Sequence, residues 1–336
     1  MAPRSHRIWT AAALIAAVFL SAPAGAAEVG VKVEAVAIPL DIENPENTGL
    51  GDLAYAGGLQ LSSPDRRFGG WSGMVLTPDG RQITAISDNG FALTLDLVRS
   101  GERLAAVGAA ALLPLADEAG RALPGDKKLA DAESLTRLAD GSLAVGFERR
   151  HRVLLYPARD DGRTALSGTP RPLATPDALQ AAPENGGLEA LLALKDGRLL
   201  GFTEDLADGN GHWRGWLFAG PGATAPTLDL ALVPTDDYQP TDLAALPDGD
   251  ILLLQRRFTV ASGPGARLSV IPAAALAGGV PIRDRELARL TPPLNVDNFE
   301  GLATWTDSAG RTRALILSDD NNSFLQRTLL MEFLLP

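Results

Sequence analysis

The chain has 336 residues, a formal net charge of −11, 46% hydrophobic and 21% charged residues, and no cysteine. This composition is typical of a packed globular protein rather than a disordered one. The negative charge argues against binding to nucleic acid or to anionic membrane surfaces, and an exported chain without cysteine depends on its core or on bound ions for stability.

The first 26 residues have the pattern of a secretory signal. Arg4 and Arg7 form a basic start, Trp9 to Leu20 is an apolar run, and Ala24-Gly25-Ala26 is a small-x-small cleavage pattern. The apolar run is short for a membrane span, although an uncleaved anchor is the alternative interpretation. We therefore expect residues 27–336 to form a single periplasmic or secreted domain that does not insert into a membrane after signal removal.

Five hairpin repeats follow along the chain. Each has two apolar strands joined by a turn, as at Asp196-Gly197, and an Asp-Gly pair between apolar runs is a strong hairpin signal because glycine adopts positive φ without steric cost. The turn glycines are Gly80, Gly141, Gly197, Gly249 and Gly310, at steps of 61, 56, 52 and 61 residues. Repeats of this size indicate a β-propeller, whose four-stranded blades need about 40–50 residues each.

The residues outside the five repeats amount to about one further repeat. They are residues 28–70 and 322–336. We therefore expect an all-β propeller of six blades, with the terminal strand Thr328 to Phe333 joining N-terminal strands in a shared blade that closes the ring and hides sheet edges. Five or seven blades also fit, because segments 91–130 and 259–297 are irregular and can hold extra strands.

Carboxylates recur at equivalent places in these repeats. Four lie where the first strand begins and two follow the second strand: Glu133, Glu189, Asp242 and Glu300, then Glu204 and Asp319. Such positions point at the channel of a propeller, where like charges repel unless something compensates them. A calcium ion held by some of these six acids is one interpretation, because calcium takes oxygen ligands. The alternative is a structural network in which the acids bind backbone N–H groups or neighbouring arginines.

Two arginine pairs occupy equivalent places in the second and fourth repeats. They are Arg149-Arg150 and Arg256-Arg257. Guanidinium groups bind phosphate or carboxylate in a bidentate fork. If the pairs converge at the channel mouth, they hold an anionic substrate; if they bridge acids on the next blade, they form no binding site.

Only His151 and His212 follow the signal, too few for a three-histidine zinc site. His151 lies beside an arginine pair and is a candidate general acid or base. Glu133 and Glu189 are the other candidate catalytic residues. The alternative for His151 is an ordinary surface histidine.

Several segments resemble the exported phytase-like family, described by esterase-like activity of phytase. They are Phe68-Gly69-Gly70-Trp71-Ser72-Gly73, Ala85-Ile86-Ser87-Asp88-Asn89-Gly90, Glu148-Arg149-Arg150-His151, Asn298-Phe299-Glu300-Gly301-Leu302 and Leu317-Ser318-Asp319-Asp320-Asn321. The resemblance covers roughly Gly57 to Phe333. It implies a β-propeller and, by wider analogy, calcium and phosphate esters. The Arg-His-Gly-x-Arg-x-Pro signature of histidine acid phytases is absent.

These observations favour a monomeric hydrolase that acts on a small anionic ester in the channel. The reaction is a phosphoesterase or esterase reaction assisted by calcium. The alternative is a non-catalytic periplasmic propeller that binds a ligand or a protein partner through its loops.

Overall fold

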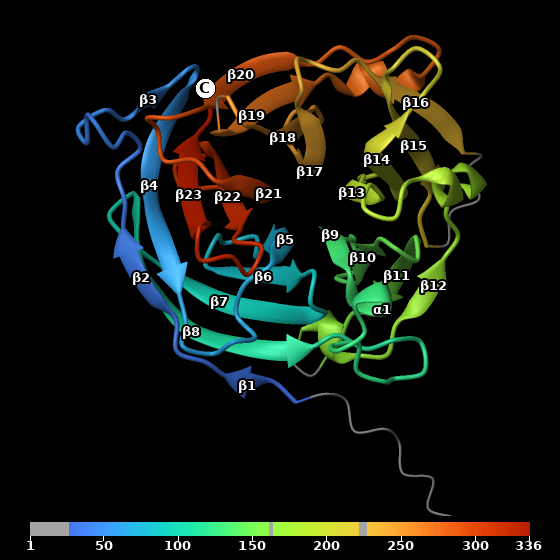
Figure 1. The fold of residues 1–336 in the computed structure, drawn as a ribbon, viewed down its shortest axis with the longest axis horizontal. Coiled ribbons are helices and arrows are strands. Elements are labelled where there is room, and N and C mark those ends of the chain that lie inside the picture. Colours follow the sequence, from blue (N-terminus) through green and yellow to red (C-terminus); the bar gives the residue numbers. More distant parts are fainter. Residues whose placement is uncertain (1–26, 161–163, 222–226, 262) are drawn as a thin grey trace, which may run out of the picture.

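The computed structural model describes residues 27–160, 164–221, 227–261 and 263–336. The expected signal, residues 1–26, lies outside this part of the chain. Five antiparallel sheets stand radially around a central axis, so the fold is a β-propeller (Figure 1). Among the described residues, no helix has the length and apolar character needed to cross a membrane.

The first two blades come from the N-terminal half of the chain. In spatial order from the rim inward, the first sheet contains β1 (Val29–Gly30), β8 (Arg103–Pro114), β7 (Phe91–Ser100), β6 (Gln82–Ser87) and β5 (Trp71–Leu76). The second contains β12 (Arg171–Leu173), β11 (Arg152–Tyr156), β10 (Leu143–Phe147) and β9 (Ala132–Arg137). The short helix α1 (Lys127–Ala130) precedes β9, and the 3-10 turns η1 (Ala165–Ser167) and η2 (Asp177–Ala181) flank β12.

The third and fourth blades run from the axis outward. The third contains β13 (Leu188–Ala193), β14 (Arg198–Ala207), β15 (Trp213–Ala219) and β16 (Leu228–Leu232). The fourth contains β17 (Gln239–Ala245), β18 (Ile251–Thr259), β19 (Gly263–Ile271) and β20 (Arg285–Leu290), with the 3-10 turn η3 (Ala273–Ala277) before β20.

The fifth blade joins the two ends of the chain, as the sequence predicted. It contains β21 (Asn298–Thr306), β22 (Thr312–Asp319), β23 (Thr328–Leu334), β4 (Leu53–Ser62) and β2 (Glu34–Ala37), and β3 (Gly49–Leu50) pairs with β4. The C-terminal strand β23 pairs with β4 from Thr328–Leu61 to Leu334–Ala54. This pairing closes the ring of blades.

The expected number of six blades is wrong. The N-terminal residues do not form a blade of their own, because β1 extends the first sheet while β2, β3 and β4 complete the fifth. Segment 91–130, which the sequence marked as irregular, contributes the long strands β7 and β8 of the first blade. The prediction counted residues 28–70 and 322–336 as one further repeat, but the strands in these segments complete the first and fifth sheets.

The core lies between neighbouring blades. Five clusters of buried apolar side chains fill the five blade interfaces, one cluster to each interface. The run Ile251 to Leu254 shows how one strand serves two of them: Ile251 and Leu253 face the third blade, whereas Leu252 and Leu254 face the fifth. A continuous apolar run is expected for a strand that is buried on both faces.

Candidate functional site in the central channel

Each innermost strand carries a β-bulge near its first residues. One residue of β5, β9, β13, β17 and β21 is skipped in the pairing with the second strand of its blade. The skipped residues are Ser72, Glu133, Glu189, Thr241 and Glu300. A bulge bends the strand and redirects the extra side chain. Three of the five, Glu133, Glu189 and Glu300, line a cavity at the axis.

Asp242, which the sequence placed in this set, is not equivalent to the three glutamates. The bulged residue of the fourth blade is Thr241. The Asp242 carboxylate is buried between blades and accepts the backbone N–H of Leu302 at 2.6 Å and of Leu243 at 2.8 Å. Burial raises the pKa of Asp242 well above its usual range, against these two hydrogen bonds. It therefore has the structural role that the alternative interpretation described.

The sequence contains a signal that identifies Thr241. The bulged residue lies eight positions before the turn glycine in the first three blades, as in Glu189 and Gly197, and the same count back from Gly249 reaches Thr241. A difference of one residue moves a side chain to the other face of a strand. Asp242 was assigned to this set by its charge, without counting from the turn glycine, and it therefore lies one residue after the bulged position.

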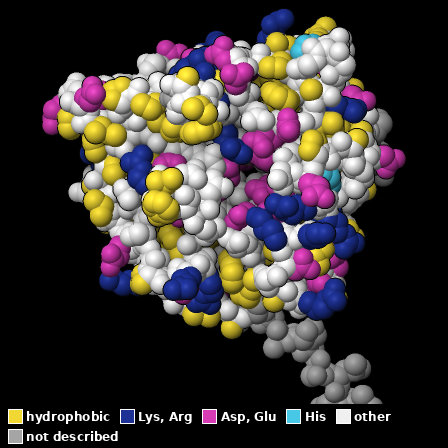
Figure 2. All heavy atoms as spheres, in the orientation of Figure 1, with side chains coloured by type: hydrophobic (Ala, Val, Ile, Leu, Met, Phe, Trp, Pro, Cys, Tyr) yellow, Lys and Arg dark blue, Asp and Glu magenta, His cyan; other side chains and the backbone are white. Residues whose placement is uncertain are grey.

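A second set of side chains comes from the end of the second strand of each blade or from the residue directly after it. In each blade, the residue just before the bulge on the innermost strand pairs with a residue of the second strand. The members of the second set directly follow that paired residue: Asp88, Glu148, Glu204, Arg256 and Asp319. All five line the same cavity, whose volume is about 210 Å³. Acidic side chains gather inside the central hollow on this face of the molecule (Figure 2). Two sets of equivalent positions thus concentrate seven acids and one arginine at the axis.

Arg256 connects three blades across the cavity. Its Nη2 lies 2.7 Å from Glu204 Oε1 of the third blade, and its Nε lies 3.3 Å from Glu300 Oε1 of the fifth. Its Nη1 donates to Asn298 Oδ1 at 2.9 Å, while Asn298 Nδ2 donates to Glu300 Oε1 at 2.7 Å. These acids raise the pKa of Arg256, despite the opposing effect of burial. Glu204 and Glu300 are therefore compensated from within the protein.

Asp131, which precedes β9, holds the other two cations of the cavity. Its carboxylate contacts Lys127 of α1 and Arg149, which follows β10. Lys127 also lies 2.7 Å from Asp88 Oδ2. Arg149 has a φ of 56°, in a region that residues other than glycine seldom occupy. The structure thus brings Lys127 and Asp131 to the site, which the sequence did not single out; the two-residue spacing of Asp131 and Glu133 was the available signal.

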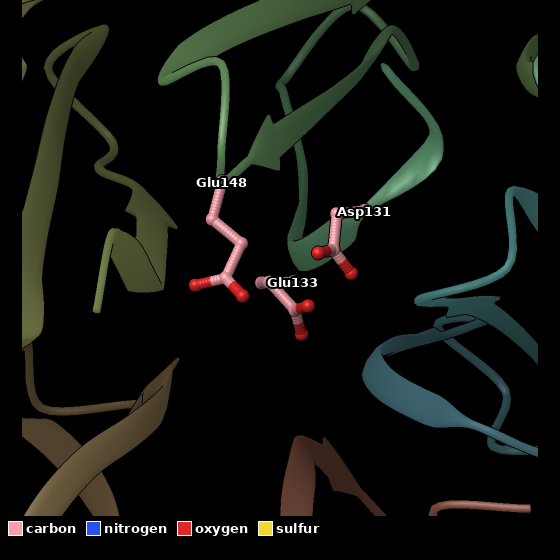
Figure 3. A group of neighbouring side chains, drawn as sticks. All are labelled: Asp131, Glu133 and Glu148. Carbon is pink, nitrogen blue, oxygen red and sulfur yellow. The ribbon is translucent and has the colours of Figure 1, made fainter. Parts of the chain in front are cut away.

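Asp131, Glu133 and Glu148 form a group of facing carboxylates (Figure 3). One oxygen of each lies within 4.8 Å of the others. Asp131 has its two cations, but no ion pair to Glu133, Glu148 or Glu189 occurs within the described ranges. These three glutamates therefore lack a direct ion pair, although the nearby charges of Arg149 and Arg256 act against the rise in the pKa of Glu148 and Glu189.

The pKa values reflect this crowding. Burial raises the pKa of Glu133, Glu189 and Glu300 well above its usual range, and neighbouring acids raise it further. Burial also raises the pKa of Glu148 to about 7, with Asp131 adding to the effect. The pKa of Asp319 rises to about 7, again mainly through burial, with Asp88 and Asp320 contributing. The channel therefore contains carboxyl groups that hold or exchange protons near neutral pH.

The remaining expected site residues divide between the cavity and its surroundings. Arg149 and Arg256 line the cavity, whereas Arg150 and Arg257 are not among its lining residues. Arg150 is exposed, and the Arg257 guanidinium packs 4.8 Å from the ring centre of Tyr238. His151 is not a lining residue either; its Nε2 lies 3.2 Å from the carbonyl oxygen of Ala182.

Comparison with known proteins gives one family and several distant structures. The sequence profile named phytase-like, described as esterase-like activity of phytase, matches residues 66–322. No curated protein matches the chain. Among solved structures, an endo-arabinase from Bacteroides thetaiotaomicron is similar at 13% identity, 79% coverage of this chain, 94% of that chain and a TM-score of 0.47.

Two further solved structures are similar over longer stretches. A gluconolactonase from Xanthomonas campestris has 14% identity, covers 94% of this chain and 99% of its own length, and has a TM-score of 0.40. An aldose sugar dehydrogenase from Streptomyces coelicolor, solved with bound PQQ, has 12% identity, 90% and 99% coverage and a TM-score of 0.43. At these identities and scores the similarities carry no information about activity.

Proposed function

The chain belongs to the phytase-like family, described by esterase-like activity of phytase, and from this membership we propose that it is an exported hydrolase of a phosphate ester or another ester. The reaction takes place in the central cavity and is assisted by calcium or a similar divalent cation. The observation that carries the proposal is the convergence of Glu133, Glu148 and Glu189 at one cavity without an ion-pairing cation within the described ranges.

The residues present fit a hard cation. Asp131, Glu133 and Glu148 offer only carboxylate oxygens, the donor type that calcium prefers. Two oxygens on opposite sides of a calcium ion are about 5 Å apart, given bond lengths of about 2.4 Å, and the 4.8 Å limit within this group agrees with that separation. Of the six acids expected as ligands, Glu133 belongs to the group. Glu189, Glu204, Glu300 and Asp319 line the same cavity, and Asp242 is turned away.

The bound cation would polarise the ester oxygen and offset the charge that develops there. The protein's own groups supply the proton transfers. Burial raises the pKa of Glu189 well above its usual range and so favours its protonated form, and in this proposal Glu189 donates to the departing oxygen. Asp319, with a pKa of about 7, accepts the proton of the attacking water.

Arg149 is the residue best placed for an anionic group of the substrate. It uses Nε to reach Asp131, and its Nη1 and Nη2 form no hydrogen bond within the described ranges. Arg256 is committed to Glu204, Glu300 and Asn298. In this proposal Arg256 therefore holds the acids rather than the substrate.

The test is hydrolysis of p-nitrophenyl phosphate and p-nitrophenyl acetate by residues 27–336, with calcium and with a chelator. We expect turnover of at least one ester that depends on calcium and that falls about 100-fold or more in Glu189→Gln. Asp205→Asn, an exposed acid one position after Glu204, is the matched control and should keep wild-type rates. Equal rates for wild type and Glu189→Gln, or no turnover of either ester, would leave the channel as a binding site without catalysis.

A further inference from the structure

The fourth blade breaks the pattern of the other four at the axis. At the bulged position of its innermost strand it has Thr241, where three blades have glutamate. At the position of the second set, on the neighbouring strand, it has Arg256, where the other four blades have an acid. A five-fold arrangement of acids would place like charges around the whole axis. The fourth blade instead inserts a positive charge into this arrangement.

Within the described ranges, the hydrogen bonds and ion pairs of the Arg256 guanidinium are all to oxygen. Glu204 Oε1 at 2.7 Å, Asn298 Oδ1 at 2.9 Å and Glu300 Oε1 at 3.3 Å surround it from the third and fifth blades. Carboxylate and amide oxygens are also the ligands that a calcium ion takes. These three oxygens already converge on one positive group, and the side chains of Glu204 and Glu300 are each only 9% exposed.

The two halves of the channel therefore differ in how their charge is balanced. On the side of the third to fifth blades, Arg256 lies between Glu204 and Glu300 and pairs with both. On the side of the second blade, Lys127 and Arg149 pair with Asp131, whereas Glu133 and Glu148 have no ion pair within the described ranges. An incoming cation therefore meets two acids that share Arg256 on one side, and two glutamates without a direct ion pair on the other.

We propose that Arg256 is a built-in cation that determines where in the channel a divalent ion binds. Its guanidinium occupies the place of a second ion among Glu204, Glu300 and Asn298, and so confines binding to Asp131, Glu133 and Glu148. Arg256 is a positioning residue. The inference rests on the proposed function only for the ion at the second blade. Whether an ion can replace Arg256 does not depend on catalysis.

The variant Arg256→Gln tests the proposal, because it removes the positive charge and leaves room among the three oxygens. Calcium stoichiometry is measured by equilibrium dialysis, and the unfolding temperature is measured with calcium and with a chelator. We expect the variant to bind one calcium ion more than the wild type. We also expect it to melt well below the wild type in chelator and to regain most of that loss with calcium.

Two further variants make the result specific. Arg256→Lys retains the positive charge and should bind the same number of ions as the wild type. Arg256→Gln combined with Glu300→Gln removes a ligand and should lose the additional ion. An Arg256→Gln variant that binds no additional ion, or that stays unfolded at saturating calcium, overturns the proposal.

The outcome separates the two proposals. If the wild type binds no ion and Arg256→Gln binds one, the second-blade cation site is wrong while the role of Arg256 stands. If the wild type binds one ion and Arg256→Gln also binds one, the second-blade site stands and the role of Arg256 is wrong.

Discussion

Arg256 Nη2 of the fourth blade lies 2.7 Å from Glu204 Oε1 of the third, so an ion pair bridges two blades at the axis. Removal of one partner leaves the other charge incompletely paired in a poorly solvated place. We expect Glu204→Gln to lower the free energy of unfolding by about 2 kcal/mol, between the values typical of buried and surface pairs. Urea denaturation measures this change in the free energy of unfolding. Asp205→Asn is the control and should stay within about 0.5 kcal/mol of the wild type; equal effects of the two variants would refute the bridge.

A second buried ion-pair network stabilises the ring where the first and fifth blades meet. Glu332 of β23 is fully buried and contacts Arg99 at 2.6 Å, Arg313 at 3.3 Å and Trp305 Nε1 at 3.1 Å. Because Arg99 would lose its anion and Arg313 would keep only Asp307, we expect Glu332→Gln to cost about 3–5 kcal/mol of unfolding free energy.

Glu34→Gln is the matched control for this network. Glu34 lies in the same sheet and pairs with Lys32, but both side chains are exposed. Its loss should cost less than about 1 kcal/mol in the same urea titration. A cost for Glu332→Gln as small as that of Glu34→Gln would show that the buried network does not fasten the ring.

The stability of the protein should depend on the protonation of Asp319. Its pKa is raised from 3.8 to about 7 in the folded state, mainly by burial. The folded state therefore binds more protons than the unfolded state between these values, and stability is lost as pH rises through this window. Asp319→Asn removes the charge and retains an oxygen for the Asn321 N–H, which Asp319 Oδ1 accepts at 2.7 Å.

We expect Asp319→Asn to be more stable than the wild type by about 2–4 kcal/mol above pH 7, from a shift of about three pKa units. The two proteins should converge below about pH 4, where Asp319 is protonated in both states. Thermal unfolding at pH 4 and pH 8 measures the difference. A gain that is equal at both pH values would mean that it does not come from the charge.

The pH dependence of activity tests the proton-accepting role of Asp319. The rate of ester hydrolysis should rise as pH increases through about 7, because the group accepts a proton only when it is ionised. In Asp319→Asn this rise should disappear and kcat should fall by about 100-fold or more. An unchanged rise in the variant would assign the pH dependence to another group.

Much of the architecture follows from patterns that the sequence displays. The turn glycines and the apolar runs between them predict a propeller, and the terminal apolar strand predicts closure with N-terminal strands, which the pairing of β23 with β4 confirms. The blade number was not predictable from repeat length, because the residues before Trp71 are divided between two sheets. Only the pairing of β1 with β8 and of β2 with β4 shows this division.

The channel could be predicted in part. Glu133, Glu189 and Glu300 were recognisable by their recurring position, since their strands begin alike and the bulge sends each side chain to the axis. Asp242 was misplaced because charge was followed instead of the distance from the turn. Lys127 and Asp131 are four positions apart, a local spacing that permits their ion pair, but the contact of Lys127 with Asp88 depends on how α1 lies against the first blade, and no local pattern encodes that approach.

The most direct test of the central claim is the unfolding temperature of residues 27–336 with calcium and with a chelator. A Glu133→Gln, Glu148→Gln double variant is compared, with Glu118→Gln, an exposed acid, as the control. A site that binds the folded state stabilises it in proportion to the logarithm of the ion concentration. We predict that calcium raises the unfolding temperature of the wild type and of Glu118→Gln by several degrees but not that of the double variant. An identical response of all three proteins, or none in any, would contradict a cation site in the channel.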